Sequence, residues 1–259
     1  MSKIKTLQKV YRTFGLLEVF FLIIRRFTQT KKTQRMGLLQ YINPSSLVLL
    51  DSNNYNTEII SDFFGIENKV LNLSLPSVNF KSRETNNFFG EEYDLGELLS
   101  TTLLLYISHF KPKLVLETGV AAGKSSSLIL NSLNVNGVGE LLSIDITKNV
   151  GSLIPENVKH RWKLFILKNL KKKSFKRIIH LFNGRVDLFL HDSNHHPHWQ
   201  IFEVKTILQA NKNISVLFID DVSVEFIELM KSQYLSFELL LLNEGKKFSC
   251  VAFRKINDH

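Results

Sequence analysis

Two glycines stand between an apolar run and a helix start, and this segment constrains the fold more than any other part of the chain. The apolar residues 114–116 end on a carboxylate, Glu117, and Gly119 and Gly123 then lead to small polar residues and a second apolar run. This order predicts a strand, a tight turn and a helix N-terminus, whose N–H groups favour an anionic ligand. Glycine at both positions lets the backbone turn sharply and lets a ligand come close.

The spacing of the turn distinguishes three classes of ligand site. A dinucleotide fingerprint has a glycine in its middle, where this chain has Ala121. A phosphate loop has four residues between its first glycine and Gly-Lys-Ser. Here only three residues separate Gly119 from Gly123. The order strand, acid, one residue, glycine, three residues, glycine and helix resembles the first motif of class I S-adenosylmethionine (SAM) methyltransferases.

The resemblance implies that SAM binds against this turn. Asp145 ends the next expected strand and follows Gly123 by 22 residues, so its carboxylate can accept hydrogen bonds from ribose hydroxyls. The cofactor-binding residues implied are Glu117, Gly119, Val120, Ala121, Gly123, Ser125, Asp145 and Asp192.

Strands and helices alternate from residue 98 onward. Strands are predicted from residue 114 and over 140–146, 162–167, 186–190, 215–219, 237–242 and 248–254, and helices over 98–110, 125–133, 169–182, 199–210 and 224–232. Residues 243–245 join the last two strands as a hairpin. The fold class is therefore α/β: a doubly wound, mainly parallel seven-stranded sheet with an antiparallel C-terminal hairpin strand. This is the Rossmann-like architecture of class I methyltransferases.

The N-terminal part predicts a separate element. We divide the chain into a helical, basic extension, 1–95, and a SAM-binding methyltransferase domain, 96–259. A strand or buried run is expected at 46–50 and a helix at 57–64. The extension would cap the substrate site, join an oligomer or contact a membrane surface.

Charge is concentrated in two segments. Residues 1–36 hold nine Lys and Arg against one acid, and residues 159–177 hold nine and no acid, in a chain of net charge +9. The helical periodicity of residues 1–35 fits a helix that packs on the domain or in a homo-oligomer. It also fits an interfacial helix on anionic lipid. The apolar stretch of this segment is shorter than the roughly 20 residues that a membrane span needs. The single cysteine, Cys250, excludes an internal disulfide and favours the cytoplasm, with membrane association left open.

Acidic residues end two further strands. Asp192 follows one, and Asp220 and Asp221 follow another. Carboxylates that meet there repel unless they are protonated or bridged by a cation, for which Mg²⁺ is suited. These segments resemble the macrocin-type sugar O-methyltransferases and cephalosporin hydroxylase-like proteins. That resemblance implies Asp192, Asp220 and Asp221 as metal ligands.

Proton removal needs a different residue from the one the resemblance implies. The general base of the sugar O-methyltransferases is an Asp at the position of Asn194, and an amide cannot take a proton. His195 comes next and titrates near neutrality, so His195 and Asp192 are the catalytic residues expected. Zinc is disfavoured, because the four histidines between 191 and 198 do not form the helical pair of a zinc site.

The sequence therefore predicts a SAM-dependent methyltransferase that acts on a hydroxyl of a sugar, a glycan or a small polar metabolite. Two rival interpretations stay open. Residues 123–125 and the strand that ends at Asp220 also suit a phosphate-loop nucleotide enzyme. Alternatively, Asn194 supports a catalytically degenerate methyltransferase fold that serves as a scaffold. Nucleic acid is a weaker candidate, because few aromatic residues interrupt the basic run 168–177.

Overall fold

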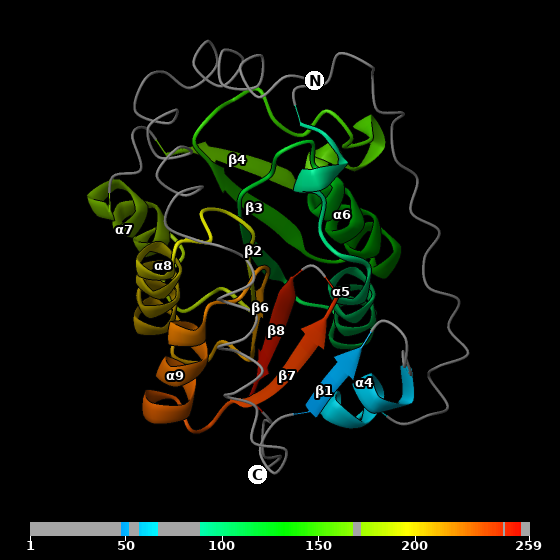
Figure 1. Cartoon of the computed structure of the whole chain (residues 1–259). Coiled ribbons are helices and arrows are strands. Elements are labelled where there is room, and N and C mark those ends of the chain that lie inside the picture. The colour runs from blue at the N-terminus through cyan, green and yellow to red at the C-terminus, as the bar shows by residue number, and fades with distance from the viewer. Residues whose placement is uncertain (1–47, 52–56, 67–88, 168–171, 246, 255–259) are drawn as a thin grey trace, which may run out of the picture. The chain divides into compact units, whose positions relative to one another are not determined.

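Eight strands form a continuous sheet through the described part of the chain, in the order β1-β7-β8-β6-β5-β2-β3-β4 (Figure 1). The structure, a computed structural model, describes residues 48–51, 57–66, 89–167, 172–245 and 247–254. The strands are β1 (Val48–Asp51), β2 (Leu114–Thr118), β3 (Glu140–Asp145), β4 (Trp162–Ile166), β5 (Leu188–His191), β6 (Val216–Ile219), β7 (Glu238–Asn243) and β8 (Phe248–Phe253). The helices are α4 (Thr57–Phe64), α5 (Glu97–Phe110), α6 (Lys124–Asn136), α7 (Lys172–His180), α8 (Pro197–Ala210) and α9 (Val224–Gln233), with short 3-10 turns η3 (Glu91–Tyr93) and η4 (Glu156–Arg161).

The strand directions confirm the predicted fold class. Every neighbouring pair is parallel except the two made by β8, which runs antiparallel to β6 and β7. All seven predicted strands are present in the sheet. An eighth, β1, extends the sheet beyond β7, where Val48 lies opposite Leu240. The described part of the run expected at 46–50 thus lies in an edge strand of the same sheet.

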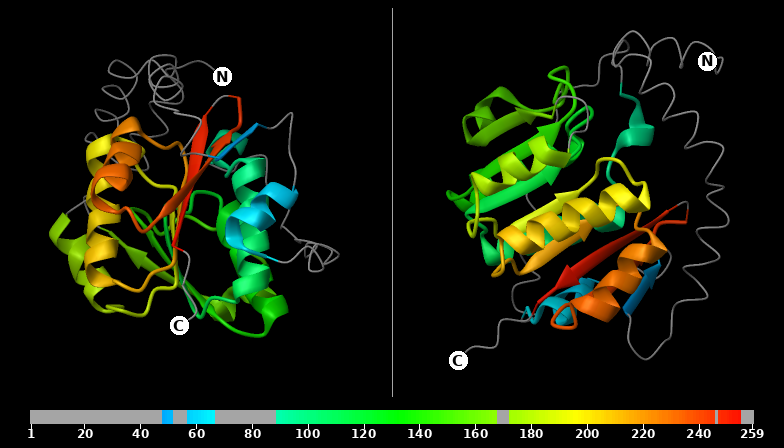
Figure 2. Two further views of the ribbon diagram at one scale, coloured as in Figure 1. Left: turned by 90° about the horizontal axis from the view of Figure 1, so that it is seen from below. Right: turned by 90° about the vertical axis from the view of Figure 1, so that its left-hand side faces the viewer.

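Helices cover both faces of the sheet. Helices α4, α5 and α6 lie on one face and α7, α8 and α9 on the other (Figure 2). On the first face α5 contacts α6, and on the second α8 contacts both α7 and α9. Because both faces are covered, the central strands read as continuous apolar runs, and every residue of β5 and β6 is buried.

An apolar cluster lies between the sheet and the first helical face. Leu99, Leu103 and Ile107 of α5 recur every four residues, which places them on one side of the helix, and each is fully buried. They join Leu130 of α6 and central strand residues in one cluster. This packing holds α5 and α6 against the strand ends that carry the polar residues.

Two predictions concern the N-terminal part of the chain: the boundary at residue 95 and the basic helix before residue 36. Residues 42–259 group into one unit by their contacts, and this unit includes β1 and α4. The helix and basic segment expected in residues 1–36 lie outside the described residues, so both stay predictions. In the described part of the chain, no helix is both long and apolar enough to cross a bilayer.

Candidate active site

The glycine turn joins β2 to α6 in a conformation that needs its glycines. Gly119 and Gly123 have φ angles of +84° and +90°, and Ala121 between them has +49°. A Cβ on Gly119 would lie 2.1 Å from the carbonyl oxygen of Asp192, so the loops after β2 and β5 touch at this residue. The chain order reverses between these two strands, and such a switch point is where open α/β sheets bind ligands.

Glu117 supports the turn from below. Its side chain is fully buried, and its two oxygens accept hydrogen bonds from the hydroxyls of Ser125 and Ser126, each at 2.6 Å, and of Ser143 at 2.7 Å. Burial raises the pKa of the Glu117 carboxyl, although the three hydroxyls act in the opposite direction. Glu117 and Ser125 were both expected at the cofactor, and in the structure they are hydrogen-bonded to each other next to the turn.

Asp145 lies beside the same turn at the end of β3. Its Oδ2 atom accepts a hydrogen bond from the backbone N–H of Val120 at 2.9 Å, and its Oδ1 atom accepts one from Thr147 N–H at 3.1 Å. Burial raises the pKa of the Asp145 carboxyl, and these backbone donors lower it. The structure thus brings the glycine turn and the acid predicted to bind the ribose together at neighbouring strand ends.

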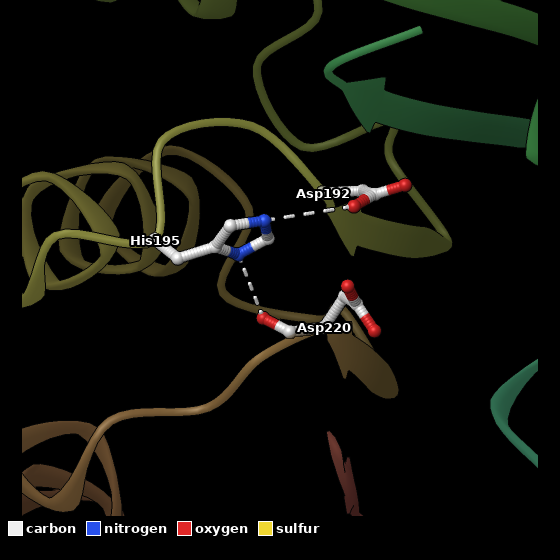
Figure 3. Close-up of side chains that lie close together, drawn as sticks. All are labelled: Asp192, His195 and Asp220. Carbon is white, nitrogen blue, oxygen red and sulfur yellow. Dashed lines mark hydrogen bonds and ion pairs between the residues drawn. The ribbon is translucent and has the colours of Figure 1, made fainter. Parts of the chain in front are cut away.

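A second polar group gathers at the ends of β5 and β6. Asp192, His195 and Asp220 each offer a possible ligand atom, and these atoms lie within 4.8 Å of one another. The His195 ring lies between the two acids: its Nδ1 atom is 3.1 Å from the carbonyl oxygen of Asp220, and its Nε2 atom is 3.9 Å from Oδ1 of Asp192 (Figure 3). Asp221 was expected in this set, and among the described residues it is not part of this cluster.

Lys247 was not foreseen at this position. Its Nζ atom lies 2.7 Å from Oδ2 of Asp220, and the hydroxyl of Ser249 donates to Oδ1 of Asp220 at 3.0 Å. Burial, and then the charge of Asp220, raise the pKa of Asp192 well above its usual range, while Lys247 lowers it. A lysine two residues after the turn glycine Gly245 looks like a solvated residue in the sequence, and only the folding of the hairpin brings it to the acids.

The cluster has the donor types that a divalent cation uses, namely carboxylate oxygens and an imidazole nitrogen. Both oxygens of Asp220 already accept hydrogen bonds, one of them from an ammonium group. A cation bound by Asp192 and Asp220 would have to displace Lys247 or lie next to its charge. The residues as arranged do not fit a bound metal ion.

A buried network fixes the loop that carries Asp192 and His195. Glu203 of α8 is almost fully buried, and its carboxylate accepts hydrogen bonds from Thr118 Oγ1 at 2.7 Å and from Ser193 Oγ at 3.2 Å. The indole N–H of Trp199 also donates to it. The end of β2, the loop after β5 and α8 are therefore joined through one side chain. A carboxylate on the apolar side of the predicted helix was the available signal for this network.

Asn194 has a structural role in the same loop. Its Oδ1 atom accepts a hydrogen bond from the backbone N–H of His196 at 3.0 Å, one residue before α8 begins. An Asn that bonds the N–H two residues later is a common turn device. The amide thus shapes the approach to the helix and leaves proton removal to another residue.

Comparison with known proteins agrees with this fold. Residues 116–222 match a family model described as a methyltransferase domain. Similar solved structures include cofactor-bound Rv0187 from MTB (11% identity over 78% of this chain and 96% of that chain, TM-score 0.50). The Podospora anserina methyltransferase PaMTH1 bound to SAH is 15% identical over 63% of this chain and 81% of that chain, with a TM-score of 0.47. The MycE methyltransferase of the mycinamycin biosynthetic pathway, in complex with Mg and SAH, is 18% identical over 45% of this chain and 30% of that chain, with a TM-score of 0.35. At 11% identity, the likeness to Rv0187 shows the fold alone. Comparison with curated proteins gives no match.

Proposed function

We propose that this chain, of which residues 116–222 match a methyltransferase-domain model, is a class I SAM-dependent methyltransferase that transfers the methyl group of SAM to a hydroxyl of a sugar, a glycan or a small polar metabolite. One observation carries the proposal: the glycine turn, the acid at the end of β3 and the Asp192–His195 pair meet at the ends of adjacent strands. A cofactor bound along the turn would therefore lie next to a base.

The cofactor half of the proposal uses the turn and Asp145. The ribose hydroxyls would donate to the Asp145 carboxylate, and the methionyl part would lie along Gly119, Val120 and Ala121, where the Gly119 backbone passes close to Asp192. The buried Glu117 would act through the turn, because its oxygens hold serine hydroxyls.

The transfer half needs few reactive groups. When bound, SAM supplies an activated methyl group on a positively charged sulfur. The loop after β5 aligns the acceptor hydroxyl, and such alignment contributes on the order of 7–11 kcal/mol to the lowering of a barrier. His195 then takes the hydroxyl proton at Nε2, since its Nδ1 atom is directed at the Asp220 carbonyl oxygen. Asp192 lies beside Nε2, and in its ionised form it stabilises the imidazolium that forms.

A phosphate-loop function is less well supported. The lysine that would bind a phosphate, Lys124, forms an ion pair with Asp94 at 3.6 Å. The methyltransferase-domain match also covers the whole turn. Magnesium, which the sequence led us to expect, is used in no step of this proposal.

Calorimetric titration with S-adenosylhomocysteine (SAH) tests the cofactor half. We expect the full chain to bind SAH, and Asp145→Asn to weaken the affinity by about ten- to hundredfold, as for loss of a hydrogen bond to a charged group. Glu140→Gln, at the exposed start of the same strand, is the matched control and should bind like the wild type. Absence of SAH binding would overturn the proposal, and SAH binding without turnover on a panel of hydroxylated acceptors would favour the scaffold.

A further inference from the structure

The ion pair between Lys247 and Asp220 occupies the position where a metal ion would be expected. The ammonium nitrogen is 2.7 Å from Asp220 Oδ2, and the Asp220 side chain is only 4% exposed. Ser249 donates to the other oxygen. Asp220 also directs the candidate base, because its carbonyl oxygen lies 3.1 Å from Nδ1 of His195. Lys247 therefore fixes the residue that orients His195.

Backbone hydrogen bonds hold the β7–β8 hairpin at Lys247. The backbone N–H of Glu244 donates to the carbonyl oxygen of Lys247 at 3.0 Å, which closes the turn. Beyond the turn, the carbonyl oxygen of Phe248 accepts a hydrogen bond from the N–H of Val222 at 2.8 Å, just after the two acids that follow β6. The main chain at Lys247 and Phe248 is thus held near the segment that follows β6.

Glu244 attaches the same hairpin to α5. Its Oε1 atom accepts a hydrogen bond from the backbone N–H of Leu98 at 2.8 Å, in the first turn of the helix. Gly96 leaves room for this carboxylate, since a Cβ there would lie 1.8 Å from Glu244 Oε2. A carboxylate at a helix N-terminus is stabilised by the helix dipole. The hairpin tip is therefore anchored on one side by Glu244 and on the other by Lys247.

The charges at the strand ends are already balanced in part. Two carboxylates, Asp192 and Asp220, lie close together, and the ammonium of Lys247 offsets their repulsion. A divalent ion at the same place would meet a fixed positive charge and an Asp220 whose two oxygens are both engaged. Since like charges repel strongly in a buried site, the lysine and the metal compete for one position.

We propose that the Lys247 ammonium takes the cation position at Asp192 and Asp220 and excludes a divalent metal ion from it. Lys247 is then a positioning residue, which holds Asp220 and through it His195 without a metal. The exclusion of metal stands on the contacts alone, whereas its consequence for methyl transfer rests on the proposed function.

Manganese binding, followed by electron paramagnetic resonance, tests the exclusion without cofactor or acceptor. Hydrated Mn²⁺ gives a sharp signal that is lost when the ion binds protein. We expect the wild-type chain at millimolar Mn²⁺ to leave the signal unchanged, and Lys247→Met to bind one ion per chain. Adding Asp220→Asn to Lys247→Met should abolish this binding, and Lys247→Arg, which keeps the charge, should behave like the wild type.

Lys163→Met is the matched control, because Lys163 forms an ion pair of the same length, 2.7 Å, with Glu140 at an exposed position. It should not create a manganese site. Stoichiometric Mn²⁺ binding by the wild type that is lost in Asp220→Asn would overturn the proposal, whether or not Lys247→Met folds. A folded Lys247→Met protein that leaves Mn²⁺ in solution would overturn it too, because the position would then not accept a cation. None of these outcomes depends on SAH binding, so they are separate from the test of the methyltransferase function.

Discussion

The Nδ1 atom of His191 lies 2.7 Å from the Oε2 atom of Glu203, and both side chains are buried between β5 and α8. The same carboxylate accepts hydrogen bonds from Thr118, Ser193 and Trp199. His191 precedes Asp192 and Ser193 follows it, so this network holds the backbone of the loop that carries Asp192. The loop geometry at the candidate active site thus depends on a helix residue outside that site.

Glu203→Gln should destabilise the fold by about 1–3 kcal/mol, since one amide oxygen cannot accept from all the donors that the carboxylate serves and buried donors are left without partners. The midpoint of urea unfolding measures this loss. Glu228→Gln removes an exposed carboxylate from α9 and serves as the control. An equal, small shift of the midpoint in both variants would show that the network contributes nothing specific.

Gly119→Ala separates backbone strain from close approach when it is compared with Gly137→Ala. Both glycines have positive φ, +84° and +70°, so either alanine should cost roughly 1–2 kcal/mol of stability. Only at Gly119 does the new Cβ meet another segment, 2.1 Å from the Asp192 carbonyl oxygen, whereas at Gly137 nothing lies within 4 Å. Gly119→Ala should therefore lose more stability and also SAH affinity. Comparable unfolding midpoints and SAH affinities for the two variants would contradict the close contact between the loops.

Much of this arrangement could be predicted from local sequence. The glycine turn, the strands that end close to Glu117, Asp192 and Asp220, and the closing hairpin each have a periodicity or a turn residue of their own. The sheet topology followed from their alternation. Placing Asp145 beside the turn also followed, because parallel strands present their carboxyl ends at one edge.

The contacts that complete the site have no such local signal. Lys247 reaches Asp220 only because β8 lies beside β6, and Glu203 meets Thr118 only through the packing of α8 on the sheet. Asp221 and Asp220 are adjacent in sequence and looked equivalent. In the structure Asp221 has a φ of +46°, and among the described residues His195 joins Asp192 and Asp220 instead. The side on which a residue after a strand end lies is decided by tertiary packing.

The Glu117 carboxyl makes stability depend on pH in a defined direction. Burial raises its pKa in the folded state above the unfolded value of about 4.3. The folded chain therefore keeps this proton over a range in which the unfolded chain has lost it. The stability from this group is complete below the unfolded pKa and falls as pH rises through the folded pKa.

Urea unfolding across this range should show that the free energy of unfolding of Glu117→Gln rises relative to that of the wild type as pH increases, by at most about 1.4 kcal/mol per pH unit. The amide keeps the shape of the group and still pairs with serine hydroxyls, which can donate or accept. Glu140→Gln, at an exposed end of β3, should leave the pH dependence of the wild type unchanged. A constant difference between Glu117→Gln and the wild type would show that Glu117 carries the same charge in both states.

His195→Ala tests proton removal on any acceptor that supports turnover. Loss of a general base lowers kcat by about 10²- to 10⁴-fold. The affinity for SAH should change little, because in the proposed complex the imidazole would contact the acceptor hydroxyl and not the cofactor. His198→Ala is the control: this residue is exposed in the first turn of α8, and its ring stacks on His196. The pH profile of kcat supplies the second readout, since the wild-type limb that reports a histidine should vanish in His195→Ala. If His195→Ala kept the wild-type kcat and the same limb of the pH profile, another group would remove the proton. His195 would then have only a structural role in the loop before α8.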